Sequence, residues 1–370
     1  MIPVLIYRLA LTAGWRKVLL PCCVLLLPAC ASEPVQPTSA QAQISVMEYV
    51  RRMHMEDGRG RFREIFCTVL EEHGRALPDY RPCEEALTRV GEEAGASGEP
   101  VSLGETRADY LVLMVPGLGW DCFEEWLGYK QSGPEYVARF GYETRFVRVD
   151  GLSSTENNAR QIRDYVAGLP AEDAGRPLIL AGYSKGTPDI LTALAAYPEL
   201  VERVVAVISL AGAVAGSPLA DDATQAQANL LTLVPGSACE ESDEGGVESL
   251  RTAVREQWLL DNPLPRDIRY YSVVTYPDPD HISWGLQKSY RILSGIDARN
   301  DTQVLMEGQM IPGSRLVAFV NADHWAIAVP VAREHPFVGN TVVNHNDYPR
   351  EALFEALLRY VEEDLAQQTQ

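Results

Sequence analysis

The segment from residue 177 to residue 186 constrains the fold of this chain more than any other. An apolar run, residues 178–181, leads directly into Gly182-Tyr183-Ser184-Lys185-Gly186, and a helix-like segment, residues 187–197, follows at once. A serine at the tip of so sharp a strand-to-helix turn takes a strained backbone conformation, and small residues two positions before and after it let the chain pass. The turn exposes the hydroxyl of Ser184 and directs the N-terminus of the following helix toward it.

Strand-like and helix-like patterns alternate on both sides of this turn. Apolar runs predict buried strands at 109–115, 144–149, 178–181, 201–210, 269–276 and 315–320. Helical patterns occupy 135–140, 157–169, 187–197 and 351–365. This alternation predicts an α/β fold, a mostly parallel and doubly wound sheet with helices on both faces.

Two regions fall outside the alternation. Residues 44–98 predict three helices, at 44–55, 61–73 and 81–94, and we expect this helical region to pack on a main domain formed by residues 99–370. Residues 216–265 mix small, acidic and apolar residues and are interpreted as an insertion that covers the sheet like a lid.

The amino-acid composition disfavours some classes of binding partner for this protein. The net charge of −19 disfavours a nucleic-acid partner, and 46% hydrophobic residues are enough for a sizeable core. No Cys-x-x-Cys pair occurs, which disfavours a thiolate metal site. We expect neither a metal nor an organic cofactor.

The N-terminus has the pattern of an export signal. Within residues 1–29, Arg8, Arg16 and Lys17 are accompanied by an apolar run, residues 18–27, that is too short to span a bilayer stably. The run ends in Leu27-Pro28-Ala29-Cys30, which resembles the lipobox of bacterial lipoproteins and implies a lipidated Cys30. A polar tether, residues 30–43, follows. These features predict a lipid-anchored protein of the bacterial cell envelope, at the outer membrane or periplasmic face, with plain secretion as the alternative.

Four cysteines remain after the predicted signal and anchor. In an exported protein an even number permits two disulfides. Cys67 and Cys83 lie in neighbouring helical segments, so their pairing is local, and Cys122–Cys239 would then tie the insertion to the loop after the first strand. The two other connectivities stay open.

A nucleophilic serine needs a base and a carboxylate that orients the base. His324 is the candidate base because it follows the last predicted strand. The candidate carboxylate is Asp301, in a turn between serine and histidine, with Asp280 and Asp297 as alternatives. Asp323 adjoins His324 and cannot easily reach its ring.

Such a serine also needs donors for the oxyanion. The loop Pro116-Gly117-Leu118-Gly119 follows the first strong strand. We therefore assign the donors to the backbone N–H groups of Leu118 and of Lys185, the residue after the serine. Trp120, Trp325 and Leu118 could line a pocket beside them.

Together these motifs resemble the α/β-hydrolase superfamily, specifically bacterial secreted lipases and esterases. Gly182 to Gly186 looks like their nucleophile elbow, and residues 210–221 are similar to their segment after the next strand. Asn300-Asp301-Thr302-Gln303-Val304 resembles their Asn-Asp-Gly-x-Val, which implies Asp301 as the triad acid, with Thr302 in place of the glycine.

The resemblance implies a serine hydrolase that cleaves carboxylic esters, from small molecules or lipids, through a Ser-Asp-His triad and an acyl-enzyme. Two other functions stay open. One is a non-catalytic envelope lipoprotein with the same fold. The other is transfer of the acyl group to an acceptor other than water.

Overall fold

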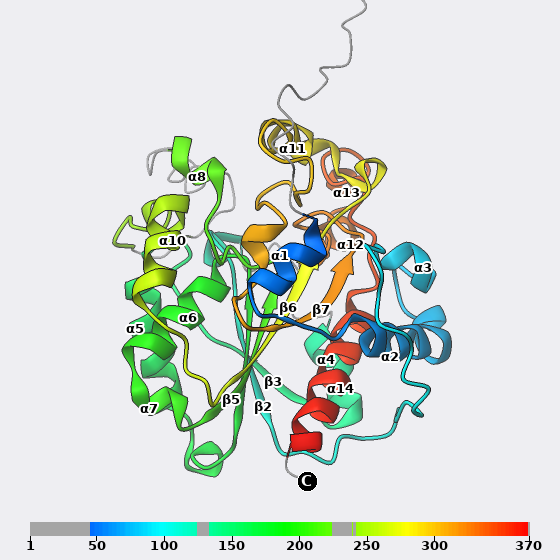
Figure 1. Cartoon of the computed structure of the whole chain (residues 1–370), viewed down its shortest axis with the longest axis horizontal. Helices are drawn as coiled ribbons and strands as arrows, with labels where there is room; N and C mark the ends of the chain where they lie inside the picture. Colours follow the sequence, from blue (N-terminus) through cyan, green and yellow to red (C-terminus); the bar gives the residue numbers. More distant parts are fainter. Residues whose placement is uncertain (1–44, 124–132, 224–238, 240–241, 369–370) are drawn as a thin grey trace, which may run out of the picture. The chain divides into compact units, whose positions relative to one another are not determined.

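A single parallel sheet organises the computed structural model, which describes residues 45–123, 133–223, 239 and 242–368 (Figure 1). Its seven described strands lie in the order β1-β7-β6-β5-β4-β2-β3, and every neighbouring pair is parallel. The strands are β1 Glu56–Asp57, β2 Leu111–Val115, β3 Glu143–Phe146, β4 Leu178–Tyr183, β5 Val204–Leu210, β6 Arg269–Thr275 and β7 Arg315–Val320. Each apolar run that predicted a strand corresponds to one of β2 to β7, so the predicted α/β fold is confirmed.

The strand order sets the place of the site. From β2 the chain moves outward to β3, and it then returns to form β4 on the other side of β2. The loops that leave β2 and β4 therefore diverge at the carboxyl end of the sheet, where ligands bind in open parallel sheets. The predicted oxyanion loop follows β2, and the predicted elbow follows β4.

Helices cover both faces of the sheet (Figure 1). One face packs against α2 Arg59–Glu72, α4 Gly133–Val137 and α14 Arg350–Gln368. The other face packs against α5 Thr155–Ala167, α6 Gly186–Ala196 and α7 Pro198–Val201. Neighbouring strand residues such as Val112 and Leu113 enter opposite layers. Burial on both faces explains why these strands read as continuous apolar runs.

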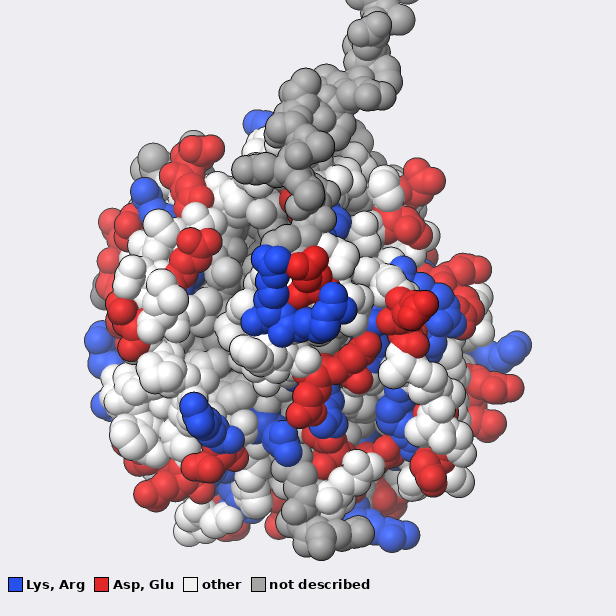
Figure 2. All heavy atoms as spheres, viewed as in Figure 1, with Lys and Arg blue, Asp and Glu red and all other residues white. Residues whose placement is uncertain are grey.

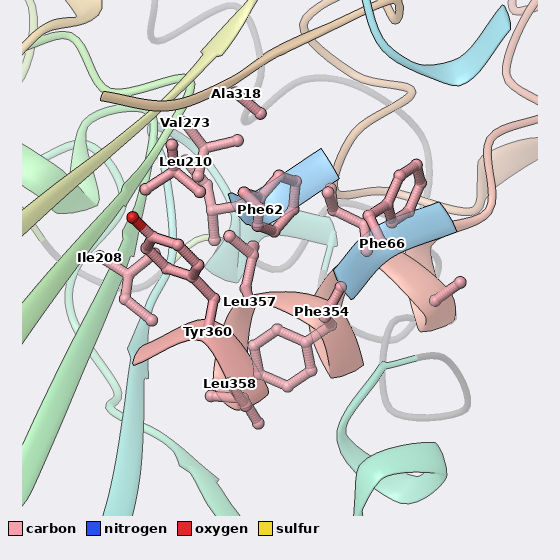
Figure 3. Packing of buried hydrophobic residues seen from close by; sticks show 14 of the residues in the cluster. Phe62, Phe66, Ile208, Leu210, Val273, Ala318, Phe354, Leu357, Leu358 and Tyr360 are labelled. Carbon is pink, nitrogen blue, oxygen red and sulfur yellow. The ribbon is translucent and has the colours of Figure 1, made fainter. Parts of the chain in front are cut away.

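The layer under α14 is built from large side chains. Phe62 and Phe66 of α2, Phe354 and Leu357 of α14, and strand residues such as Ile208 meet there (Figure 3). Residues Gln43–Gln370 form one compact unit, and every hydrophobic cluster of the described residues lies inside it. The hydrophobic clusters of the described residues are therefore formed within this unit.

The N-terminal region packs on the sheet and also adds backbone pairs to its edge. The first two predicted helices appear as α1 Val46–Arg52 and α2. The predicted helix at 81–94 is wrong, because only α3 Cys83–Ala86 is helical. Leu87 instead pairs antiparallel with Val320, and the Thr88 N–H donates to the Phe319 carbonyl oxygen at 2.9 Å. Backbone pairing with the open edge of β7 therefore overrides the local helical pattern.

One carboxylate ties this region to the link that follows it. Glu64 of α2 accepts hydrogen bonds from the Ser97 N–H and hydroxyl and from the Gly98 N–H, at 2.7 to 2.8 Å. Partial burial opposes ionisation, but these hydrogen bonds prevail and lower the pKa of Glu64 to about 2.

The structure pairs Cys67 with Cys83 and Cys122 with Cys239, the connectivity expected from the sequence. The first bond joins α2 to α3. The second joins the loop after β2 to the predicted insertion, 216–265.

The described part of the insertion contributes two helices and a 3-10 turn, and residues 224–238 and 240–241 lie outside the described residues. The elements are α8 Pro218–Asp222, the turn Glu248–Leu250 and α10 Thr252–Asp261. The predicted signal, the tether and Cys30 also lie outside the described residues. Within the described part of the chain, no helix is both long and apolar enough to cross a bilayer.

Candidate active site

A tight turn between β4 and α6 holds Ser184. Its φ of +53° lies in the left-handed region that residues with a Cβ rarely adopt. The flanking glycines make room for it. A Cβ on Gly182 would lie 2.7 Å from the backbone of Thr187, and one on Gly186 would lie 2.1 Å from the Val115 carbonyl oxygen. The glycine spacing seen in the sequence is therefore a steric requirement of this turn.

Three side chains that are far apart in the sequence form one hydrogen-bonded chain. His324 Nε2 lies 2.9 Å from Ser184 Oγ, and His324 Nδ1 lies 2.7 Å from Asp301 Oδ2. An ionised carboxylate only accepts hydrogen bonds, so Nδ1 carries the proton and the lone pair of Nε2 faces the hydroxyl. The arrangement can draw a proton from Ser184 while the imidazole stays oriented.

The Asp301 carboxylate is fully buried and held from several sides. Oδ1 accepts hydrogen bonds from the N–H groups of Gln303 and Val304, at 2.9 and 2.7 Å. Oδ2 accepts one from the Thr275 hydroxyl at 2.6 Å in addition to His324. The His324 N–H also donates to the Asp301 carbonyl oxygen at 3.0 Å. These contacts leave the carboxylate little rotational freedom and fix the imidazole through it.

The other candidate carboxylates lie elsewhere. Asp280 is exposed in a short 3-10 turn, and Asp297 pairs with Arg299. Asp323 accepts hydrogen bonds from the N–H groups of Trp325, Ala326 and, in another loop, Ser283. Burial raises the pKa of Asp323. Because its carboxylate accepts hydrogen bonds from these backbone N–H groups, Asp323 acts as a structural cap for the turn that contains the histidine.

Sequence reasoning missed two residues that support the hydrogen-bonded chain of Ser184, His324 and Asp301. The Tyr183 hydroxyl donates to the His324 carbonyl oxygen at 2.7 Å, and the two rings lie 5.3 Å apart. Thr275 holds Asp301, as described above. A polar residue that ends a buried strand, as Thr275 ends β6, was the available signal.

The predicted oxyanion loop approaches the serine closely. A Cβ on Gly117 would lie 3.0 Å from Ser184 Cβ. The neighbouring Gly119 N–H donates to the Gly151 carbonyl oxygen, which fixes the loop. The N–H groups of Leu118 and Lys185 donate no hydrogen bond to another residue in the described part of the chain. Both remain available to a ligand oxygen beside Ser184.

The side chain of Lys185 lies below the turn and is buried. Its Nζ contacts Asp189 Oδ1 and Oδ2 at 2.7 and 3.0 Å, and the Asn158 amide donates to Asp189 Oδ2 at 2.8 Å. Burial raises the pKa of Asp189, which the cation of Lys185 opposes. The ion pair between Lys185 and Asp189 holds Lys185, whose backbone N–H is a candidate oxyanion donor, against the first turn of α6.

A cavity of about 240 Å³ opens beside Ser184 and is mostly apolar. The insertion forms one wall, and Trp325 and Leu118 lie in the lining, as expected. Trp120, predicted to join them, instead packs near Phe146 and Tyr183 and lines a different cavity. The lining residues are Leu118, Tyr183, Ser184, Ala213, Ser217, Leu219, Ala220, Ala223, Val247, Leu250, Gln303, Val304, His324 and Trp325.

The site can now be set against known proteins. No protein-family profile and no curated protein sequence matches the chain. Among solved structures, the metagenomic carboxyl esterase MGS0156 is 37% identical, with a TM-score of 0.80 over 85% of this chain and 95% of that chain. This chain belongs to the α/β-hydrolase superfamily of esterases and lipases. The α/β-hydrolase fold also matches Staphylococcus hyicus lipase, at 13% identity and a TM-score of 0.52, over 74% of this chain and 100% of the lipase.

Proposed function

We propose that this α/β-hydrolase cleaves carboxylic esters, with Ser184 as nucleophile, His324 as base and Asp301 as orienting acid. The observation that carries the proposal is the unbroken hydrogen-bonded chain from Ser184 Oγ through His324 to the buried Asp301. The free N–H groups of Leu118 and Lys185 complete the set that such a reaction needs.

In the first half-reaction, Ser184 Oγ attacks the ester carbonyl carbon as His324 Nε2 takes its proton. The carbonyl oxygen becomes an oxyanion, which the N–H groups of Leu118 and Lys185 stabilise. Asp301 balances the charge of the imidazolium. The carbon–oxygen bond to the alcohol then breaks, the alcohol takes the proton from His324, and the acyl group stays on Ser184.

In the second half-reaction, His324 removes a proton from water as the water oxygen attacks the acyl carbon. The bond to Ser184 Oγ breaks, Oγ regains a proton from His324, and the carboxylic acid leaves. An alcohol could replace water in this step. Product analysis with and without added alcohol distinguishes hydrolysis from acyl transfer.

The apolar cavity beside Ser184 supports an ester with a hydrocarbon acyl group, because burial of apolar surface favours such a chain there. MGS0156 is a carboxyl esterase, which agrees with this substrate class. A series of p-nitrophenyl esters of increasing acyl length measures the chain that the cavity accepts.

The direct test is Ser184→Ala, measured with a fluorophosphonate probe and with p-nitrophenyl esters. We expect loss of labelling and a fall in turnover of roughly 10³-fold or more, with an unchanged circular dichroism spectrum. Labelling of Ser184→Ala at the wild-type level would refute the nucleophile. A wild-type protein that neither labels nor hydrolyses any ester would favour the non-catalytic alternative.

Neighbouring acids offer a matched comparison for the carboxylate. Asp301→Asn removes the carboxylate that partners His324 Nδ1. Asp323→Asn changes a buried acid that adjoins the same histidine in the sequence, but among the described residues this acid contacts backbone N–H groups and Ser283. We expect a loss of roughly 10³- to 10⁴-fold in kcat for the first and a much smaller loss for the second. The reverse order would reject Asp301.

We further propose that the enzyme is exported and anchored through a lipid on Cys30, which the N-terminal pattern supports. Cys30→Ser should move the protein from the membrane fraction to soluble export or to an unprocessed precursor. Identical mass and fractionation of the two proteins would argue against lipidation.

A further inference from the structure

An exposed helical stripe lies at the carboxyl end of the sheet. It runs along α11 Gln287–Ser294 and its flanks, where Trp284, Ile292 and Ile296 are 70%, 50% and 59% exposed. Within α11, the exposed Lys288 and Ile292 are four positions apart and share one side of the helix, and Trp284 and Ile296 lie on the segments that flank it. We call Trp284, Lys288, Arg291, Ile292 and Ile296 the α11 face.

The opposite side of the segment is anchored to the protein. Leu286 and Leu293 are buried. The N–H of Trp284 donates to the Asn344 side-chain oxygen and the N–H of Gly285 to the Val342 carbonyl oxygen, both at 2.8 Å. The α11 face is therefore presented by a fixed helix, and its exposure is not that of a loose loop.

The α11 face carries cations and no acids. Lys288 and Arg291 are exposed, and neither forms an ion pair with another residue that the structure describes. Residues 281–296 contain no Asp or Glu, in a chain of net charge −19. On the side of the molecule seen in Figure 2, acidic and basic groups lie interspersed over most of the surface. The α11 face is thus a local concentration of cations among exposed apolar groups.

More apolar surface lies close by. Val342, which receives the hydrogen bond from Gly285, is 36% exposed, and Phe337 of α13 Pro336–Gly339 is 82% exposed. Figure 1 places α11 and α13 together at the end of the molecule toward which β6 and β7 point. The exposed apolar groups therefore continue from the α11 face onto a neighbouring element.

We propose that the α11 face docks on an anionic phospholipid bilayer. A tryptophan and two isoleucines that are exposed on a helix and its flanks can enter the boundary between headgroups and acyl chains. The neighbouring cations, Lys288 and Arg291, are attracted to anionic headgroups. Residues 281–296 contain no Asp or Glu that would repel these headgroups. A lipidated Cys30 would hold Ser45 within about 50 Å of the same bilayer, because an extended chain spans at most ~3.5 Å per residue.

Helix α11 adjoins the candidate active site through serines that do not belong to the α11 face. The Gln303 amide donates to the Ser289 hydroxyl at 3.3 Å, and the Asn300 amide donates to the Ser294 hydroxyl at 3.2 Å. Gln303 lines the cavity beside Ser184. A bilayer against the α11 face would therefore be separated from the cavity lining by this helix. The docking itself does not depend on ester hydrolysis, and it can be tested without activity.

The test uses the compact unit Gln43–Gln370 with Ser184→Ala, so that no lipid is cleaved during the measurement. Its binding to mixed phosphatidylcholine–phosphatidylglycerol vesicles is measured by co-sedimentation at low salt, against vesicles of pure phosphatidylcholine. We expect binding to the anionic vesicles that weakens with added salt. Lys288→Ala with Arg291→Ala should weaken it by roughly 30-fold, from the known attraction of single cations to anionic membranes.

Matched variants elsewhere on the surface serve as controls. Arg107→Ala with Arg266→Ala makes the same change of charge at exposed positions outside the α11 face. Leu260→Ser on α10, where the leucine is 78% exposed, matches Ile292→Ser. We expect the α11-face variants to lose binding and the controls to keep it, with the same unfolding midpoint for all.

Two results would overturn the proposal. One is equal binding of anionic vesicles by the α11-face variants and the controls. The other is dimerisation of the vesicle-free unit that the α11-face variants abolish in sedimentation equilibrium, which would assign this face to a second copy of the chain. Because the readout is binding, failure of either kind would leave the proposed ester hydrolysis untouched.

Discussion

The two disulfides close loops of very different length, so their loss should destabilise the protein to different degrees. Cys67 and Cys83 are 16 residues apart, and Cys122 and Cys239 are 117 apart. A cross-link stabilises mainly because it removes conformational entropy from the unfolded chain, and longer loops lose more. We therefore compare the free energies of unfolding of two double variants. One combines Cys67→Ala and Cys83→Ala, and the other combines Cys122→Ala and Cys239→Ala.

The loop lengths give the magnitudes directly. Loops of 16 and 117 residues correspond to losses of about 3 and about 5 kcal/mol in the free energy of unfolding. The loops do not overlap in the sequence, so the two losses should add to about 8 kcal/mol. That sum is as large as the whole stability of many domains, so the protein without either bond should be largely unfolded at room temperature.

Guanidinium unfolding, followed by circular dichroism and tryptophan fluorescence, measures both pairs. The variant that lacks Cys122–Cys239 should be the less stable by about 2 kcal/mol. It should also lose esterase activity, because Cys122 follows closely after the loop that contains Leu118. Equal losses, or a larger loss for the short loop, would refute the account based on unfolded-chain entropy.

Three further predictions concern single residues. Lys185→Met leaves the buried Asp189 carboxylate without its cation, and it should lower the free energy of unfolding by about 3–5 kcal/mol in urea titration, whereas Lys185→Met with Asp189→Leu should recover much of this. Glu64→Gln should destabilise the protein at pH 7. The pKa of Glu64 is lowered from 4.5 to about 2 in the folded state, so its contribution is present above pH 4.5 and lost as the pH falls toward 2, and the difference between wild type and variant should shrink at pH 3. Gly186→Ala places a Cβ against the Val115 carbonyl oxygen and should lower kcat by at least about tenfold, whereas Gly175→Ala, with open space around it, should not.

The parts of the fold that could be predicted are those whose structure leaves a pattern in neighbouring residues of the sequence. The strands β2, β4, β5, β6 and β7 are buried on both faces, and burial of this kind produces an apolar run that a reader can see, whereas β3 at the sheet edge is only half-buried. The elbow is visible for a similar reason, because its glycines answer a local steric demand around Ser184. The placement of Asp301 and His324 was accessible since each follows the expected strand or turn.

The parts that could not be predicted depend on distant partners. Nothing in Glu56–Asp57 signals a strand, because two residues have no period and β1 exists only through pairing with β7. Residues 81–94 have a helical composition, yet the edge of β7 competes for the backbone of Leu87. Thr275 belongs to no motif, and nothing in the elbow motif assigns a supporting role to Tyr183. Their support of the site becomes visible only in the folded sheet, where Thr275 at the end of β6 contacts Asp301 and Tyr183 at the end of β4 contacts His324 after β7.

The shared edge of β7 has a consequence for how the chain is made. Glu56 pairs with Arg315 and Leu87 with Val320, so residues that leave the ribosome or an export channel first must wait for those that leave near the end. The local Cys67–Cys83 bond can form during that wait, but the sheet cannot close on this side. Until it does, β7 presents an unpaired edge of the kind through which strands of different molecules associate. The N-terminal region can thus pair only after β7 is made, and in doing so it covers an edge through which molecules could associate.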